Sequence, residues 1–192
     1  MKKNGLLLGC IIGGFVLVST ALIMIWGIGA YNNIVTSEQS VTRQWHLLAD
    51  EFKKKSDIIP DLITFVLSSQ RIDSSEVDEI IRIHDSLIVI SESFDINSES
   101  DFNLNYQKIR NDLNQSVTNL LIKIEDYPVL KANENFQRLN AQLSRADSRI
   151  IVEKRKFIEI VNEFNTTVKT IPNSIIAAIF GFNKKHYSQL VS

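Results

Sequence analysis

Residues 5–52 read GLLLGCIIGGFVLVSTALIMIWGIGAYNNIVTSEQSVTRQWHLLADEF, and this stretch decides the fold. Residues 5–30 contain no charged side chain, and a run of this length exceeds the roughly 20 residues that an α-helix needs to cross a bilayer. We therefore predict a membrane-spanning helix over 5–30, after a short tail of residues 1–4. A cleaved signal peptide is the alternative, but its apolar region is shorter, whereas residues 22–26 here are still strongly apolar.

The two ends of this segment indicate its orientation. Lys2 and Lys3 precede it, while Trp26 and Tyr31 lie at its far end, where amphipathic rings favour the headgroup layer. Arg43 is the first positive charge after the segment. The positive-inside rule thus favours a cytoplasmic N-terminus, with the rest of the chain outside the cytoplasm. We predict a single-pass protein of the cell membrane, held in the lipid bilayer through residues 5–30.

Cysteine content and charge exclude several classes of protein. Cys10 is the only cysteine, so a disulfide framework or a thiolate zinc site is excluded. Residues 7–10 read LLGC, similar to a lipoprotein acylation box, but few residues precede them and the apolar run continues well beyond, so we interpret the match as chance. Lysine and arginine total 21 against 22 acidic residues, which gives no basic excess for nucleic acid.

The membrane segment continues into a long amphipathic helix. Neither glycine nor proline interrupts the sequence between Tyr31 and Phe52. Spacings of 7, 4, 3 and 4 align one apolar stripe, made of Ile34, Val41, Trp45, Leu48 and Phe52. We predict a bend at Pro60, whose ring removes a backbone hydrogen bond and crowds the carbonyl of Ser56.

Three further helices follow, with a short fifth one at the end. We predict the second from Asp73, as N-cap with Glu76 at its third position, and the third over 102–124, ended by Tyr127-Pro128. Residues 91–101 are polar and predict a loop. The fourth helix begins near Asn133, where the cluster Asn133-Glu134-Asn135 supplies a cap, and runs until Pro172. After Pro172, Ser174 is the expected cap of a short helix over 175–180, which Gly181 ends.

These elements predict an all-α protein. Strand-like alternation is absent from the sequence, and long helices joined by short connections hide their apolar stripes by packing antiparallel. We expect the N-terminal membrane helix to continue into an antiparallel four-helix bundle over 31–182, with a tail of 183–192. This layout returns residues 175–180 to the start of the first helix, so we expect that apolar helix at the membrane surface.

Two blocks of residues resemble the LemA family, a bacterial group of membrane-anchored helical proteins. The first block contains Tyr31-Asn32, Val35, Val41, Trp45 and the run Asp57-Ile58-Ile59-Pro60-Asp61-Leu62-Ile63. The second contains the run Tyr127-Pro128-Val129-Leu130-Lys131-Ala132-Asn133-Glu134-Asn135-Phe136, then Arg149-Ile150, Arg155, Phe164-Asn165, Pro172, Ala177 and Gly181-Phe182. Both blocks follow the order and spacing of the family.

The chain also departs from the family pattern. Asp61 stands where the family has asparagine, Lys54 and Lys55 replace arginines, and Ile158 replaces an asparagine. Residues 67–126 match only as a helical pattern. The resemblance implies an anchored antiparallel bundle without an established enzymatic activity, and it supplies no catalytic residues to carry over.

The residues of these blocks have a structural and a functional interpretation. Asp57 and Asp61, one turn apart around Pro60, fit either a binding surface or a bend whose polar groups satisfy the freed backbone, and we favour the bend. The candidate structural or interaction motif is Asp57, Pro60, Asp61, Tyr127, Pro128, Asn133, Pro172 and Gly181. His46, His84 and His186 lack the short spacing of a metal site, and we expect packed or half-exposed histidines.

The function expected from the sequence is noncatalytic. The chain has no glycine-rich phosphate loop, no paired-histidine helix and no nucleophile elbow, so we expect no catalytic residue, no metal and no cofactor. We predict a protein-interaction or scaffolding module at the bacterial membrane, with an unidentified protein partner and with homo-oligomerisation left open. The alternative is an enzyme or ligand carrier with a site inside the bundle, built from residues such as Arg149 and Arg155.

Overall fold

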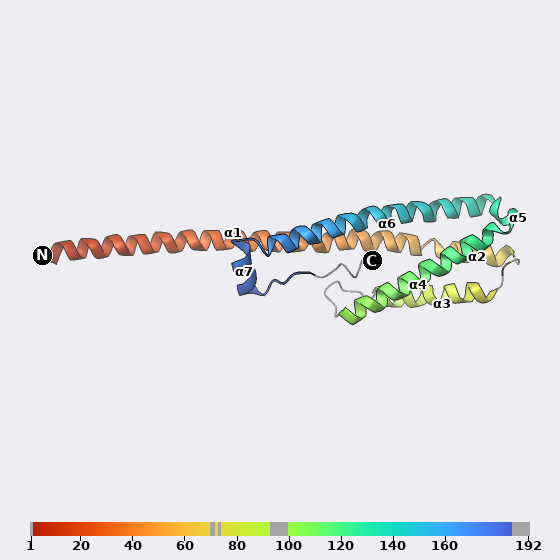
Figure 1. Ribbon diagram of the computed structural model, residues 1–192, viewed down its shortest axis with the longest axis horizontal. Coiled ribbons are helices and arrows are strands. Elements are labelled where there is room, and N and C mark those ends of the chain that lie inside the picture. Colours follow the sequence, from red (N-terminus) through yellow and green to blue (C-terminus); the bar gives the residue numbers. More distant parts are fainter. Residues whose placement is uncertain (1, 70–71, 73, 93–99, 186–192) are drawn as a thin grey trace. The chain divides into compact units, whose positions relative to one another are not determined.

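The described residues of the computed structural model are 2–69, 72, 74–92 and 100–185, and every element in them is a helix (Figure 1). In chain order the helices are α1 (Lys2–Ser56), α2 (Ile59–Ser69), α3 (Ser74–Glu92), α4 (Ser100–Glu125), α5 (Pro128–Lys131), α6 (Glu134–Thr167) and α7 (Asn173–Phe180). The predicted all-α class is confirmed.

The junction between α1 and α2 confirms the predicted bend at Pro60. The α1 helix runs unbroken to Ser56, and Pro60 is the second residue of α2. Proline has no amide to return to the carbonyl of Ser56. His84 of α3 replaces the missing donor. Its Nε2 lies 3.2 Å from the Ser56 carbonyl oxygen, and a carbonyl oxygen can only accept a hydrogen bond. The freed backbone group is thus satisfied from a neighbouring helix, and the aspartates beside the proline remain exposed.

The chain divides into two compact units. The first comprises residues 1–41 and 160–185, and the second comprises residues 42–159. In the first unit, the part of α1 after its apolar stretch packs with the end of α6 and with α7. Its buried apolar side chains are Ala30, Ile34, Val41, Val161, Phe164, Val168 and Ala177.

The second unit contains the antiparallel bundle. Three contacts show its antiparallel direction, because residue numbers rise along α1 and α2 while they fall along α6. The ring of Trp45 contacts that of Phe157 at a tilt, Lys55 donates to Asp147, and Phe65 stacks on Phe136. Helices α3 and α4 lie side by side (Figure 1). The order of contacts agrees with the predicted bundle.

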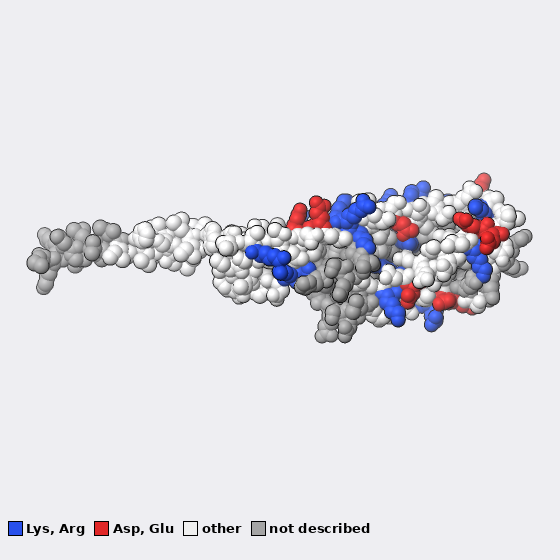
Figure 2. All heavy atoms as spheres, viewed as in Figure 1, with Lys and Arg blue, Asp and Glu red and all other residues white. Residues whose placement is uncertain are grey.

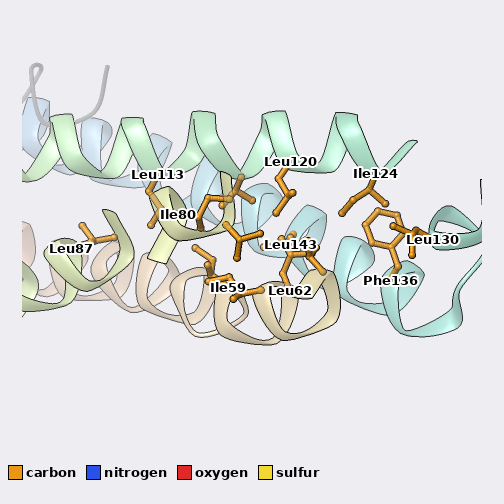
Figure 3. Close-up of a cluster of buried hydrophobic side chains, with 14 of the residues drawn as sticks. Ile59, Leu62, Ile80, Leu87, Leu113, Leu120, Ile124, Leu130, Phe136 and Leu143 are labelled. Carbon is orange, nitrogen blue, oxygen red and sulfur yellow. The ribbon is translucent and has the colours of Figure 1, made fainter. Parts of the chain in front are cut away.

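A cluster of apolar side chains forms the core of this bundle. Side chains from α2, α3, α4, α5 and α6 point toward one another in Figure 3. The labelled members are Ile59, Leu62, Ile80, Leu87, Leu113, Leu120, Ile124, Leu130, Phe136 and Leu143. Burial of each such side chain stabilises the fold by about 1.5–3 kcal/mol relative to exposure.

Several predicted boundaries need correction. The loop expected over 91–101 is shorter, because α3 extends to Glu92 and α4 begins at Ser100; residues 93–99, and the predicted cap Asp73, lie outside the described residues. Ser174 is not the cap of the last helix. The α7 helix begins at Asn173, with Pro172 at the N-cap position, and the Ser174 amide donates to the carbonyl of Thr170. The short α5 helix was not predicted.

Candidate functional site

The apolar part of α1 presents an outward apolar surface. From Phe15 to Ile25, every large apolar side chain is more than half exposed. Figure 2 shows no charged residue on the described part of this segment. Among the described residues, one helix is long and apolar enough to cross a membrane. A helix whose apolar side chains contact no other part of the protein is stable in a bilayer, because lipid chains contact those side chains instead.

The α7 helix packs against the end of this segment, within the first unit. A Cβ placed on Gly27 would lie 3.8 Å from Cδ1 of Ile176, an ordinary contact distance. The ring of Tyr31 lies 4.9 Å from that of Phe180 and 5.8 Å from that of Phe182, centroid to centroid. Tilted and edge-on rings at these distances attract one another. Aromatic contacts thus fix α7 where the apolar run ends.

The outer surface of α7 is apolar as well. Ile171 just before the helix is 82% exposed, and Ile175, Ile179 and Phe180 are each at least half exposed. Exposed apolar side chains gathered on one short helix mark a surface that contacts lipid or another protein.

Pro172 and Gly181 set the bounds of α7. Pro172 occupies its N-cap position, after a cis peptide bond. Gly181 has φ +76°, a left-handed conformation that glycine adopts without strain. The amide of Phe182 then donates to the carbonyl of Ala177 at 2.9 Å and turns the chain back toward Tyr31. Both predicted motif residues therefore have a structural role beside the end of the apolar segment of α1.

Polar contacts hold the chain after α7. Asn165 on α6 pairs twice with the backbone of Lys185: its Nδ2 donates to the carbonyl at 3.0 Å, and its Oδ1 accepts from the amide at 2.9 Å. The Lys185 ammonium lies 2.9 Å from a carboxylate oxygen of Glu38 on α1. Nearby, the positive charge of Lys169 lowers the pKa of Lys184, so two further ammonium groups are close together here.

The other predicted motif residues lie in the second unit and do not form one cleft. Asp57 is in the turn before α2, and Asp61 is exposed in its first turn. Tyr127 and Pro128 start α5, and the half-buried Tyr127 packs on the hydrophobic core. Asn133 caps α6, because its Oδ1 accepts from the amide of Asn135 at 2.9 Å. The cap predicted at Asn133 is confirmed.

The histidines do not meet. His46 is exposed on α1, His84 is buried against Ser56, and His186 lies outside the described residues. Within the part of the chain that the structure describes, no group of three His, Cys, Asp or Glu side chains is arranged to hold a metal ion.

The sequence reasoning missed a buried polar group in the second unit. Arg110 and Gln107 of α4 are both more than nine-tenths buried. The signal was present: Arg110 lies four residues after Tyr106 and three before Leu113, so helical spacing places it beside the apolar stripe.

Comparison with known proteins supplies the family. None of the curated proteins matches the chain. The model of the LemA family matches residues 44–192, a segment that includes Pro60 and residues 127–136 but begins after Tyr31. Because the match covers more than half of the sequence, the chain belongs to the LemA family.

Proposed function

We propose that this chain is a noncatalytic, membrane-anchored helical module that presents its bundle to a protein partner at the bacterial cell membrane. The observation that supports the anchor is the apolar outer surface of α7, seated by aromatic contacts at the end of the apolar segment of α1. In water this surface would be an unpaired apolar patch, whereas at a bilayer it is buried among acyl chains.

Accessibility of α7 to water tests the anchor. A single cysteine in place of Phe180, in a Cys10→Ser background, is labelled in native membrane vesicles with a water-soluble maleimide. Slow labelling is expected because lipid covers the position. A cysteine at the exposed Ser144 of α6 is the matched control and reacts fast. Equal rates at the two positions would exclude the membrane contact.

Topology needs a separate experiment. We propose that the bundle lies outside the cytoplasm, on the basis of Lys2 and Lys3 before the apolar segment. Single cysteines at Ser74 and Asn133, without Cys10, are exposed to a membrane-impermeant thiol reagent in intact and in lysed cells. Labelling of intact cells supports a bundle outside the cytoplasm. Labelling only after lysis would place the bundle in the cytoplasm.

A surface of α6 supports the interaction role. Ile151 and Ile158 are seven residues apart, and hence on one face of α6, and they are 50% and 42% exposed. Val152 beside them is also about half exposed. Apolar side chains repeated at helical spacing on a solvent face are typical of a docking site for another helix.

Site-specific photocrosslinking in living cells tests this surface. A photoreactive residue at Ile151 or Ile158 should form discrete protein adducts, because a docked partner lies within contact distance. Thr118, exposed on α4, is the control position. Adducts of the same pattern from all three positions, or from none, would contradict a partner on this face of α6.

The competing function is an enzyme or ligand carrier with a site inside the bundle. Arg149 and Arg155, considered for such a site, are both exposed on α6 and do not enter the core. One observation nevertheless favours ligand binding, namely the buried Arg110 on α4. Binding of a small molecule would be lost on substitution of Arg110, whereas docking on the outer face of α6 would not change.

A further inference from the structure

Arg110 is a buried cation that pairs with no carboxylate among the described residues. The residue is only 7% exposed, and the Nε and Nη1 atoms of its guanidinium are buried without a hydrogen-bond acceptor. Burial lowers its pKa, which the neighbouring Tyr106 partly offsets. Removing a charge from water costs several kcal/mol unless an opposite charge compensates. A native protein rarely leaves a guanidinium in this state.

Other donors surround the same position. Gln107 precedes Arg110 by three residues, on the same side of α4, and its buried Nε2 also has no acceptor. Across from α4, the half-buried Lys154 of α6 lies close enough that its pKa is lowered, first by burial and then by the charge of Arg110. Two unpaired buried donors therefore lie one turn apart on α4, and the charge of Lys154 on α6 is close enough to interact with that of Arg110.

Aromatic rings set the shape of this region. The guanidinium carbon of Arg110 lies 4.0 Å from the ring centre of Phe52 on α1 and 5.9 Å from that of Tyr106. A ring beneath the planar guanidinium partly compensates its charge and holds its orientation. The ring supplies no acceptor for the Nε and Nη1 hydrogens, so the donors remain unsatisfied.

Two other buried or partly buried donors of this bundle are paired. Lys55, on α1, donates to Asn114 and to Asp147. Gln44 donates to a carboxylate oxygen of Glu153 at 2.6 Å. The same three helices therefore satisfy their other buried donors, and Arg110 with Gln107 is the exception among the described residues.

We propose that Arg110, Gln107 and Lys154 form a binding site for a small oxyanion, a carboxylate or phosphate group, in the layer between α1, α4 and α6. The anion accepts from the guanidinium and amide donors and balances the two positive charges. Charge-assisted bonds of this kind are the strong ones, particularly where water is excluded. This inference is independent of the anchoring role and of the docking surface on α6.

Thermal unfolding of the full-length protein in detergent micelles tests the site. Sodium phosphate or sodium acetate is titrated at constant ionic strength against sodium chloride. Because a ligand that binds only the folded state stabilises it in proportion to the logarithm of its excess, Tm should rise steadily with anion concentration. A rise in Tm with phosphate identifies a phosphate group as the ligand, and a rise in Tm with acetate identifies a carboxylate. Either result supports the site.

Matched substitutions assign the effect to Arg110. Arg110→Met should abolish the anion-dependent rise in Tm, and Gln107→Leu should weaken anion affinity about tenfold. Without anion, Arg110→Met should unfold at the same temperature as the native protein or higher, since it removes an uncompensated buried charge. Arg145→Met, at an exposed arginine of α6, should leave the anion response unchanged.

Two results would overturn the proposal. Equal Tm responses in the native protein and in Arg110→Met would show that the anions act elsewhere. The second concerns Glu51, which has a buried oxygen, Oε2, without a partner, while its Oε1 pairs with Lys54. If Glu51→Gln and Arg110→Met each destabilise the protein and the double substitution adds nothing further, then Glu51 neutralises Arg110 and no external anion is needed.

Discussion

At the scale of single residues, side chains both near and distant in sequence satisfy polar groups that would otherwise be unpaired. His84 donates to the carbonyl that Pro60 leaves unpaired at the end of α1. Gln44 and Lys156 both donate to Glu153. Each contact joins or stiffens helices at a point where the backbone or a charge would otherwise be unsatisfied.

The bond from His84 should be measurable as stability. Replacing His84 with Leu keeps a buried side chain but removes the donor, so the Ser56 carbonyl loses its partner at a cost of about 1–3 kcal/mol. His84→Gln restores a donor and should recover part of this loss. Urea unfolding followed by tryptophan fluorescence measures both. The control is His46→Leu at an exposed position; a loss there equal to that of His84→Leu would refute the role of the bond.

Glu153 predicts a pH dependence of stability. Hydrogen bonds from Lys156 and Gln44 lower its pKa, so folding favours the ionised carboxylate. A lowered pKa contributes stability that is present above the unfolded value of about 4.3 and is lost as pH falls through the folded value. Glu153→Gln should therefore be less stable than the native protein at pH 7, and the difference should shrink in acid. A difference that is constant from pH 7 to pH 3 would contradict this linkage.

At the scale of helices, packing decides which of several apolar faces becomes the core. Phe157 and Ile158 are adjacent on α6, yet Phe157 is fully buried against Trp45 whereas Ile158 is 42% exposed. The α7 helix is different, because one side packs on α1 while the other remains apolar and open.

Truncation of the two neighbours on α6 should have unequal effects. Phe157→Ala leaves a cavity beside Trp45 and should cost about 3–5 kcal/mol in the free energy of unfolding. Ile158→Ala removes an exposed side chain and should change stability by less than about 0.5 kcal/mol. Denaturant unfolding compares the two variants in the same detergent. Similar losses would mean that α6 is rotated from the orientation described above.

The end of α7 depends on glycine. Gly181→Ala introduces a side chain at φ +76°, which costs about 1–2 kcal/mol for L-residues even though space is open there. Part of the α7 contact with Tyr31 should be lost, and a cysteine at Phe182 should become more reactive to a water-soluble maleimide. Gly181→Asn tolerates the left-handed region better and should be nearer to the native protein. No change for Gly181→Ala would show that this cap does not hold α7.

At the scale of the whole chain, two features fit a membrane-anchored helical protein of the LemA family. One is the helix that, among the described residues, is long and apolar enough to cross a membrane, and the other is a bundle with an apolar core. The charged residues are confined to the rest of the chain, since none lies between Gly5 and Ser37. Residues 5–30 carry no charged side chain, so this segment is the candidate membrane anchor.

Charges placed in this segment should release the protein from the membrane. Leu17→Arg with Leu22→Arg places two guanidinium groups near the bilayer centre, at about 2.5–3.5 kcal/mol each on insertion scales. The fraction that resists alkaline carbonate extraction should fall. Val129→Arg, at an exposed position of α5, is the control and should stay in the membrane fraction. Equal retention of both variants would mean that another part of the chain anchors it.

The sequence by itself determined the long helices, the anchor candidate and the bend, because each follows from a local rule. Apolar spacings of three and four give the helices, uninterrupted apolar length gives the anchor candidate, and proline at residue 60 gives the bend. It also placed Asn133 as a cap, since that bond joins neighbours in the chain. The tertiary structure alone decided that His84 serves the Ser56 carbonyl and that Tyr31 meets Phe180 and Phe182. It likewise left Arg110 buried without an acceptor. These contacts join residues 28 to about 150 positions apart, and helical periodicity fixes which face is apolar but not which partner lies against it.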